Sequence, residues 1–550
     1  MDFTYHASSN AREITSSPSY ARKMHGMERL LATVAERVHG FGHLFMGYHL
    51  LFQSSEPTCQ SMCDTVRTAW IHTRFIAPWI AIRTTTVAEE KNSWFQVYDE
   101  PSATNMKPVN DWADATILWR EEMQGLSEWE SCLKERFWTP SAGRFGVELH
   151  VAKAPEEGYF IMASIGHWIA DGRGALQVIE LFFRNLQKEF SGNTIPVHLL
   201  PWGSELERLC PATVEALDVG HVETQHCPLL PEISHPPSPS SLHRKSGKRE
   251  FIRPLLEVPR WEHLSARQTH IRLSRAETTA FHDMCAQRRA NSTALISAIS
   301  ILADVETAFH VARAHGGDKA CQKVFDDFMA AEIYTIAENM ADRRSLLCRK
   351  LPAVSAPGGF GNNVCEVFPT THNMEHIRNC VKFNSDPTTS NQCTKLVDIR
   401  SNVHFWEGLV GETEKQLKAN KKTTPEAFAI TERATEASVP FFRTVDHFLP
   451  GVLCTSIGRL SSLGLFTSFL PSSSTANNTN DTFTIPDILL GTRATGPDVQ
   501  HVAVMSFEYN DRLTINLAGS PRWHSDDAWE FYVKSVRKSF EVLLEGKAKL

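Results

Sequence analysis

Residues 159–183 have the sequence YFIMASIGHWIADGRGALQVIELFF, an apolar run followed by a polar turn and then by an amphipathic pattern. The run 159–165 predicts a buried strand, and apolar side chains at helical spacing from Leu176 onward predict a helix with one buried face. The turn between them carries His167, Asp171 and two glycines. A buried strand followed by a helix is typical of a mixed α/β fold, in which the residues just after a strand commonly bind ligands or react.

The rest of the chain alternates between helical and strand patterns in the same way. A hairpin is predicted where residues 147–151 alternate in polarity and residues 159–165 return as its second strand. A last helix is predicted to begin after Ser525, with Asp526 and Asp527 in its first turn. The remaining expected elements are helices at 20–38, 59–73, 276–288 and 293–314, strands at 43–55, 79–86, 359–369 and 448–458, and a hairpin at 501–519.

A segment rich in proline and serine divides the chain nearly in half. Residues 229–250, LLPEISHPPSPSSLHRKSGKRE, are too polar to be buried and too rich in proline for a sheet. We therefore predict a first domain over 1–228, a crossover linker over 229–250 and a second domain over 251–550. Both halves carry the same mixed pattern, so two similar α/β domains are the expected architecture.

The composition is that of a globular protein with more than one domain. The 550 residues are 42% hydrophobic and 22% charged, with a formal net charge of -7 and no long basic block, so nucleic acid is not an expected partner. No segment approaches about twenty uninterrupted apolar residues, so no membrane span is expected. The 12 cysteines are scattered along the chain, which favours free thiols. The polar N-terminal segment lacks the apolar core of a signal peptide. The expected location is the cytoplasm.

The spacing of His167 and Asp171 does not by itself decide between chemistry and structure. A reactive imidazole fits the pattern, and so does a turn histidine beside an aspartate that caps the following helix. Gly172 and Gly174 permit a tight turn in both cases. On residue chemistry alone, both interpretations stay open.

Other arrangements in the sequence are weaker. Glu36, His39 and His43 could share a helical face and bind a metal, but two glycines interrupt that helix, so no metal is expected. The chain has no Gly-x-Ser-x-Gly sequence, which disfavours a serine hydrolase of the common α/β type.

Three segments carry a resemblance to a known family. The segment ASIGHWIADGRG resembles the His-x-x-x-Asp-Gly signature of the coenzyme A-dependent acyltransferase superfamily. That superfamily includes plant BAHD acyltransferases, fungal trichothecene and alcohol acetyltransferases, and nonribosomal peptide condensation domains. The segment ENMADRRSLL, followed by GGFGNN, is similar to the Asp-x-Arg-Ser and Gly-Asn stretches of the second half of these enzymes. The segment CTSIGRL lies where alcohol acetyltransferases have Ser-Asn-x-Gly. The fungal trichothecene 15-O-acetyltransferase group is the most similar.

The resemblance implies a fold and a catalytic residue. The expected fold is two chloramphenicol acetyltransferase-like domains of mixed sheet and helix, with an active-site channel between them. His167 takes the role of general base, removing the proton of the acceptor hydroxyl and returning it to the coenzyme A thiolate. Asp171 is expected to hold the turn by a salt bridge to Arg344, with Arg343 as the second choice, and Gly172 to shape the turn.

The resemblance also implies candidates for the two substrate sides. Ser456, or a backbone amide near Ile457 and Gly458, is the candidate for stabilising the oxyanion at the donor side, although the plant Asp-Phe-Gly-x-Gly sequence is absent. Trp168 is a candidate for the acceptor side, and the alternative for this residue is the protein core. Condensation domains have a further histidine at the position of Gly166, which argues mildly against a condensation domain.

The expected function is an acyl-CoA-dependent O-acetyltransferase that acts on a hydroxyl of a fungal secondary metabolite, such as a trichothecene-like sesquiterpenoid alcohol. Transfer is expected to be direct, in a ternary complex, with acetyl-CoA or another acyl-CoA as co-substrate, no bound cofactor and no metal. The expected partners are the alcohol and the acyl-CoA, and the expected state is a monomer. The alternatives are a condensation-like domain that depends on a carrier protein, and a catalytically inactive relative that only binds.

Overall fold

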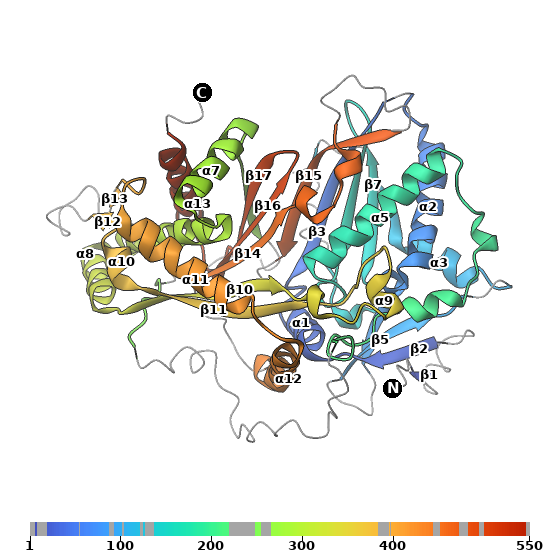
Figure 1. Cartoon of the computed structure of the whole chain (residues 1–550), viewed down its shortest axis with the longest axis horizontal. Helices are drawn as coiled ribbons and strands as arrows, with labels where there is room; N and C mark the ends of the chain where they lie inside the picture. The colour runs from blue at the N-terminus through green and yellow to red at the C-terminus, as the bar shows by residue number, and fades with distance from the viewer. Residues whose placement is uncertain are drawn as a thin grey trace.

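The structure is a computed structural model of the whole chain. It describes residues 6–7, 19–53, 55–86, 93–101, 104–120, 125–126, 137–218, 248–254, 266–382, 395–396, 398–443, 451–471, 482–493 and 500–545. Of the predicted linker 229–250, only residues 248–250 belong to this part, so the predicted domain boundaries stay a prediction. The described elements form two large mixed sheets, each with its own helices (Figure 1).

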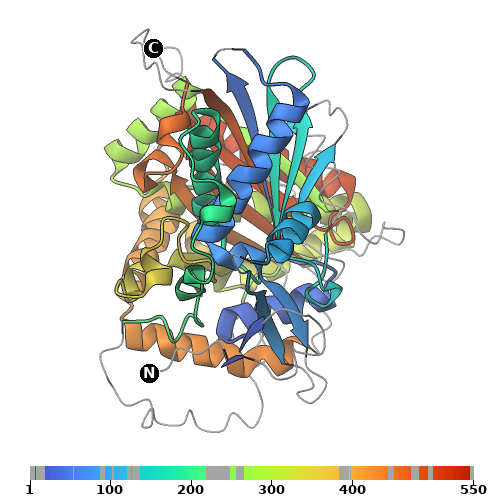
Figure 2. The same ribbon diagram turned by 90° about the vertical axis from the view of Figure 1, so that its right-hand side faces the viewer.

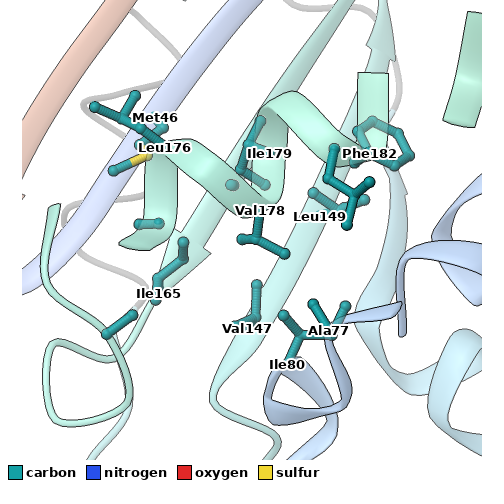
Figure 3. Packing of buried hydrophobic residues seen from close by; sticks show 14 of the residues in the cluster. Met46, Ala77, Ile80, Val147, Leu149, Ile165, Leu176, Val178, Ile179 and Phe182 are labelled. Atoms are coloured by element: carbon teal, nitrogen blue, oxygen red, sulfur yellow. The ribbon is translucent and has the colours of Figure 1, made fainter. Parts of the chain in front are cut away.

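The first large sheet has the strand order β15-β3-β8-β7-β6. The predicted hairpin forms, because β7 and β8 are antiparallel neighbours in this sheet. Figure 3 shows the apolar face of the helix that follows the turn, with Leu176, Ile179 and Phe182 packed over the strands. The elements of this unit are β3 (His43–Phe52), β6 (Ile117–Arg120), β7 (Val147–Lys153), β8 (Tyr159–Ile165), α2 (Cys59–Ile76), α3 (Lys107–Thr116) and α5 (Gly172–Phe190).

A small sheet lies beside the first large one, with the order β1-β2-β5-β4. Figure 2 shows a helix from the second half of the chain, α12, lying along the base of the molecule beneath this sheet, and the same helix packs against α1. The elements here are β1 (His6–Ala7), β2 (Ser19–Lys23), β4 (Arg83–Thr86), β5 (Trp94–Asp99), α1 (Gly26–Arg37) and α12 (Pro425–Phe442).

The second large sheet has the order β11-β10-β14-β16-β17-β9. Its strands β14 and β16 are parallel, and one face packs on α8 and α13 in a second hydrophobic core. The bounds are β9 (Arg267–Arg272), β10 (Ile333–Asp342), β11 (Cys365–Asn373), β14 (Gly451–Arg459), β16 (His501–Tyr509), β17 (Arg512–Gly519), α7 (Arg275–Arg288), α8 (Ser292–Ala330), α9 (Pro352–Ser355), α10 (Met374–Arg378), α11 (Gly411–Asn420) and α13 (Asp526–Leu544). A two-stranded sheet of β12 (Val381–Lys382) and β13 (Lys395–Leu396) lies apart from it.

One described strand from the second half of the sequence pairs with the first sheet. β15 (Phe483–Arg493) comes from the second half of the sequence, yet it pairs antiparallel with β3 at the edge of the first sheet. Its buried side chains complete the first core, whose members on this strand are Phe483, Ile485, Ile488 and Leu490. The two halves of the sequence are therefore not two separate sheets.

Several predicted elements differ from those observed. The expected helix 20–38 begins only at Gly26, because residues 19–23 form β2, which pairs with β1 and β5. The expected strand 79–86 begins with a short 3-10 turn at Pro78–Ala81, and only Arg83–Thr86 is extended. The expected strand 359–369 is extended only from Cys365.

Helix α8 is longer than predicted and has a non-helical Gly317 within it. It is long and apolar enough to cross a membrane by length and composition alone, but 94% of the apolar window is buried inside the protein. Its apolar residues are covered by the second core, as in the central helix of a globular domain.

Candidate functional site

Asp171 is the N-cap of α5, directly after the turn that follows β8. Its Oδ1 accepts hydrogen bonds from the backbone N–H groups of Arg173 at 3.1 Å and Gly174 at 2.9 Å. A carboxylate at this position satisfies two donors that the first turn of a helix would otherwise leave unpaired. The helix cap suggested by the sequence is therefore present, and it takes up one oxygen of the carboxylate.

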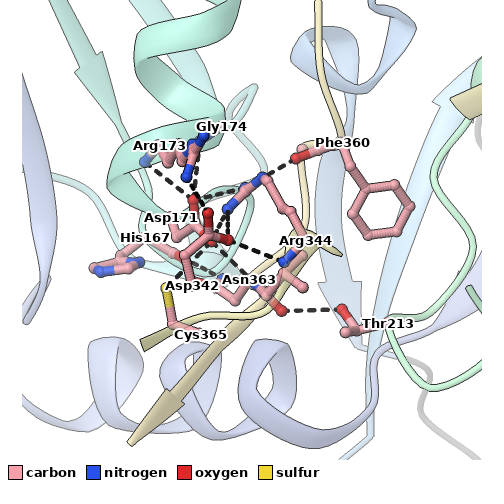
Figure 4. A network of polar contacts seen from close by, with 12 residues as sticks. His167, Asp171, Arg173, Gly174, Thr213, Asp342, Arg344, Phe360, Asn363 and Cys365 are labelled. Carbon is pink, nitrogen blue, oxygen red and sulfur yellow. Dashed lines mark hydrogen bonds and ion pairs between the residues drawn. The ribbon is translucent and has the colours of Figure 1, made fainter. Parts of the chain in front are cut away.

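The same carboxylate is held from the second half of the chain. Arg344 donates two hydrogen bonds to Asp171, from Nη2 to Oδ1 at 2.7 Å and from Nη1 to Oδ2 at 2.9 Å (Figure 4). The backbone N–H of Val364 donates to Oδ2 at 3.0 Å, and Arg344 also donates to the carbonyl of Phe360 at 3.1 Å. Burial alone would raise the pKa of Asp171, but Arg344 and the amides of Gly174 and Val364 hold that pKa below its ordinary value. Asp171 is therefore a buried, charged anchor.

Arg343, the second choice for this pairing, has a different partner. Its guanidinium binds the carboxylate of Glu366, with Nε donating to Oε2 at 2.7 Å, and it also donates to Thr423. The structure thus assigns the pair at the turn to Arg344.

A second ion pair joins the two halves beside the first. Arg173 binds the carboxylate of Asp342, and Asp342 also accepts from the Nη1 of Arg344 at 3.2 Å. The four side chains form a chain of alternating charge, Arg173, Asp342, Arg344 and Asp171, that crosses from α5 to the end of β10 (Figure 4). The turn is therefore fixed at two adjacent points.

His167 lies at the start of this turn, and Figure 4 shows its imidazole pointing away from the carboxylate of Asp171. Its backbone carbonyl accepts a hydrogen bond from Nδ2 of Asn363 at 2.7 Å, a contact from the second half. The side chain is half-buried, and its Nδ1 is buried without a well-formed hydrogen bond to the described residues. Burial lowers the pKa of His167, while its own backbone and the charge of Asp171 oppose this shift. The ring is therefore a neutral base near neutral pH.

A glycine in the turn just before β3 packs against this imidazole. Gly42 has φ of +77°, and a Cβ added to it would lie 3.3 Å from the Cβ of His167 and 3.4 Å from its Cδ2. This close approach fixes one side of the ring. The positive φ and the contact both favour glycine at this position.

The donor-side candidates lie on β14, at an irregularity in its pairing with β16. The register shifts between Ser456 and Gly458, so Ile457 is an extra residue, and Gly458 has φ of +87°. The Cδ1 of Ile457 lies 4.0 Å from the Cβ position of Gly172, which brings the bulge next to the turn.

The side chain of Ser456 is not on the side of β14 that faces the turn. Side chains alternate along a strand, so Ser456 shares the face of Cys454, which lies against Ser297 and Ser300 of α8. The predicted role of the Ser456 hydroxyl at the turn does not agree with this placement. The backbone amide at the bulge remains the candidate.

Trp168 belongs to the core and not to an accessible surface. The side chain is 1% exposed, and its indole N–H donates to Oγ1 of Thr84 at 3.0 Å. The indole also explains Gly166, because a Cβ added there would lie 2.6 Å from the ring of Trp168. The predicted acceptor-side role of Trp168 is therefore not supported, and the core alternative holds.

Sequence reasoning missed three groups at the site. Asn363 is the last residue of GGFGNN, a segment that the sequence marks only by its similarity to the family, and Val364 follows it. Gly42 is one of the two glycines that interrupt the helix considered for a metal site. No local pattern indicates that these residues meet His167 or Asp171. Among the residues that the structure describes, no group of three or more His, Cys, Asp or Glu side chains is arranged for a metal ion.

Comparisons with known proteins relate the chain to acetyltransferases. No family model matches the chain. Residues of the chain are 24% identical over 290 positions to acetyltransferase pigO of Monascus ruber, a match that spans 51% of this chain and 55% of that protein. The match thus covers about half the length of its curated relative. This relationship agrees with the resemblance carried by the three sequence segments.

Solved structures share the fold over nearly the whole chain. Trichothecene 15-O-acetyltransferase TRI3 from Fusarium sporotrichioides superposes with a TM-score of 0.69 at 14% identity, covering 96% of this chain and 95% of that one. The first condensation domain of the calcium-dependent antibiotic synthetase gives 0.55 at 11% identity, covering 95% and 97%. These matches confirm the predicted mixed α/β fold of the acyltransferase type.

Proposed function

We propose that this chain is an acyl-CoA-dependent O-acyltransferase that moves an acetyl group from acetyl-CoA to a hydroxyl of a fungal secondary metabolite, such as a sesquiterpenoid alcohol. The observation that carries the proposal is the placement of His167. A neutral imidazole is held at the junction of the two halves, while the neighbouring carboxylate is fully engaged elsewhere. The relationship to an acetyltransferase and the shared fold support the reaction class.

In the proposed reaction, His167 accepts the proton of the acceptor hydroxyl as the oxygen attacks the thioester carbonyl. Its lowered pKa keeps the ring unprotonated before this step. When the tetrahedral intermediate collapses, the imidazolium returns the proton to the coenzyme A thiolate. The backbone amide at the bulge of Ile457 is the proposed oxyanion donor, since bulges commonly aim backbone groups at reaction sites.

Asp171 has a structural role in this proposal. Its carboxylate already binds Arg344 and three backbone N–H groups, so it is not free to orient the imidazole of His167. Direct transfer is proposed because the thiol that contacts the carboxylate of Asp171, that of Cys365, is a poor nucleophile. Burial raises the pKa of Cys365 well above its ordinary value, and the charge of Asp171 raises it further.

The condensation-like alternative has less support. The fold similarity to a condensation domain covers 95% of this chain, but a Cβ at Gly166 would lie 2.6 Å from the indole of Trp168. A second histidine is therefore excluded sterically at the position where those domains have one. We also propose a monomer in the cytoplasm, where the nine described cysteines, all free, would stay reduced.

The test is acetyl transfer by the purified protein with acetyl-CoA and a panel of terpenoid alcohols, followed by release of free thiol. His167→Ala should lose turnover while coenzyme A binding, measured by calorimetry, is retained. His198→Ala is the matched control, because His198 is an exposed histidine in the short 3-10 helix Val197–Leu199. Near-wild-type turnover of His167→Ala would contradict the proposed base, and transfer only from a carrier-protein thioester would favour the condensation-like alternative.

A further inference from the structure

One carboxyl group on the second sheet is used neither by the fold nor by the site described above. Glu338 lies on β10, four residues before Asp342. The nearby charged residues Asp342, Arg343 and Arg344 are all paired. Within the described part of the chain, the side chain of Glu338 makes no hydrogen bond or ion pair.

The pairing of β10 with β14 decides which face Glu338 occupies. Glu338 lies opposite Leu453, and Asn339 lies opposite Cys454. Cys454 belongs to the core under α8, whereas Leu453 belongs to a separate small cluster on the other face, with Met340 beside it. Because paired residues point to the same side of a sheet, the Glu338 carboxyl projects from the face opposite to α8. An extra residue in β10 at this point, between Ile336 and Asn339, produces this orientation.

This face of the second sheet is turned toward the first half of the chain. At one end of β14, Ile457 reaches the Cβ position of Gly172. At the other end, His501 lies opposite Gly451, and its ring packs edge-on against Phe41 at 6.3 Å between centroids.

The turn that carries His167, residues 166–172, lies over the part of β14 between these two contacts. Phe41 is next to Gly42, the residue that packs against His167, and Gly172 follows Asp171 at the other end of the turn. Leu453 lies between the two contacts, four residues before Ile457, which at about 3.3 Å per residue is about 13 Å along the strand. Glu338 is therefore on the surface that His167 and its turn overlie.

The surroundings of Glu338 on this face are mainly apolar. The side chain keeps part of its surface accessible, yet burial alone raises its pKa to about 7. Its neighbours on this face are apolar, namely Met340, Leu453, Ala503 and Ala518. A desolvated carboxyl without a partner is costly, and proteins keep such groups mainly where a ligand completes the hydrogen bonds.

We propose that Glu338 binds a second hydroxyl of the acceptor, distinct from the one that is acylated, and thereby selects which hydroxyl reaches His167. This inference rests on the proposed function. A site that hydrogen-bonds a hydroxyl discriminates strongly against the analogue that lacks it, because the buried carboxyl is then left without a partner. The apolar neighbours favour a hydrophobic alcohol with at least two hydroxyls over a charged acceptor.

The test compares n-nonanol with the corresponding terminal diol. The two hydroxyls of the diol are separated by about the spacing of Leu453 and Ile457 along β14, about 13 Å. Binding to the full-length protein is measured by calorimetry, and acetyl transfer from acetyl-CoA is measured in parallel. The wild type should bind the diol about tenfold more tightly than n-nonanol, as expected for one hydrogen bond to a buried acidic group. Glu338→Leu should remove this preference without weakening the binding of n-nonanol, and Glu338→Gln, which retains hydrogen-bonding capacity, should restore it.

The matched control is Glu530→Leu, an exposed carboxyl on α13, on the opposite side of the same sheet. It should keep the preference for the diol, and circular dichroism should show that all variants are folded. Equal binding of the two alcohols by the wild type, or a preference that survives Glu338→Leu, would overturn the inference. A preference that depends on Glu338 without thiol release in any variant would support the binding site while contradicting the proposed acetyl transfer.

Discussion

The ion pair between Arg344 and Asp171 is buried at the junction of the two halves. Its removal should lower the free energy of unfolding more than the removal of any other contact at that junction. In Arg344→Met, Asp171 would lose both guanidinium hydrogen bonds, at 2.7 and 2.9 Å, and the carbonyl of Phe360 would lose its donor. The side chain of Asp171 is 2% exposed and that of Arg344 is 12% exposed, so water cannot replace these contacts fully. Removing one partner of such a pair typically costs about 3 to 5 kcal/mol.

The neighbouring pair of Arg173 and Asp342 gives a matched control with the same chemistry. It joins the same two halves of the chain, but its side chains are 34% and 27% exposed. Solvent screening reduces the value of such a pair to about 1 kcal/mol or less. Arg173→Met should therefore destabilise the protein several times less than Arg344→Met, although both variants remove one arginine from the same network.

The assay is urea unfolding, with the unfolding free energy compared among the wild type, the two arginine variants, Asp171→Asn and the double variant Asp171→Asn with Arg344→Met. The double variant should lose less than the sum of its two single variants, because each single change leaves a buried polar group without its partner. Acetyl transfer by Arg344→Met should also fall, since Asp171 anchors the turn that carries His167. Equal losses for Arg344→Met and Arg173→Met, or strict additivity in the cycle, would refute this reasoning.

Two further substitutions test other parts of the structure. Gly42→Ala should lower kcat with little change in coenzyme A binding. Its methyl group, on a residue with φ of +77°, would lie 3.3 Å from the Cβ of His167. Unchanged kinetics would show that this contact is unimportant. Glu432 tests pH dependence, since burial raises its pKa to about 8, helped by the charges of nearby glutamates. This pKa lies above the value of about 4.3 for a glutamate in the unfolded chain, so the folded state holds the proton more tightly. The contribution of Glu432 to stability is therefore complete below about pH 4.3 and is lost as the pH rises toward 8. The loss is at most about 1.4 kcal/mol per pH unit. Urea unfolding of Glu432→Gln should lack this decline relative to the wild type, and parallel pH profiles would contradict it.

The sequence predicted those parts of the site that depend on local pattern. The strand, turn and helix that carry His167 and Asp171 are contiguous, so their apolar periodicity and the capping aspartate define them without knowledge of the rest of the fold. The partnership with Arg344 came from a family resemblance across more than 170 residues, and the structure brings these two side chains together. Neither periodicity nor composition would have identified it.

The remaining contacts depend on the register of distant strands, which a local pattern does not determine. The face of Ser456 follows from its alternation with Cys454, which packs under α8, and the bulge beside it is defined only by pairing with β16. Trp168 is buried in the first core, where its indole N–H donates to Thr84, a residue 84 positions away. A shift of one residue in a strand moves every side chain to the other face, so candidates on strands are predicted less reliably than candidates on turns.

Strand β15 belongs to the second half of the sequence but completes the first sheet. The stability of the first half of the chain therefore depends on the second half. A fragment of residues 1–228 would leave β3 as an open edge and would lack four buried apolar side chains of β15, Phe483, Ile485, Ile488 and Leu490. At about 1.5 to 3 kcal/mol for each buried side chain, their loss amounts to about 6 to 12 kcal/mol, comparable to the whole stability of a typical domain. The fragment alone should therefore be unfolded or aggregated, as judged by circular dichroism and gel filtration, and fusion of residues 482–493 to it should increase its soluble fraction. A fragment that is folded and monomeric without β15 would show that the strand is dispensable for folding of the first half.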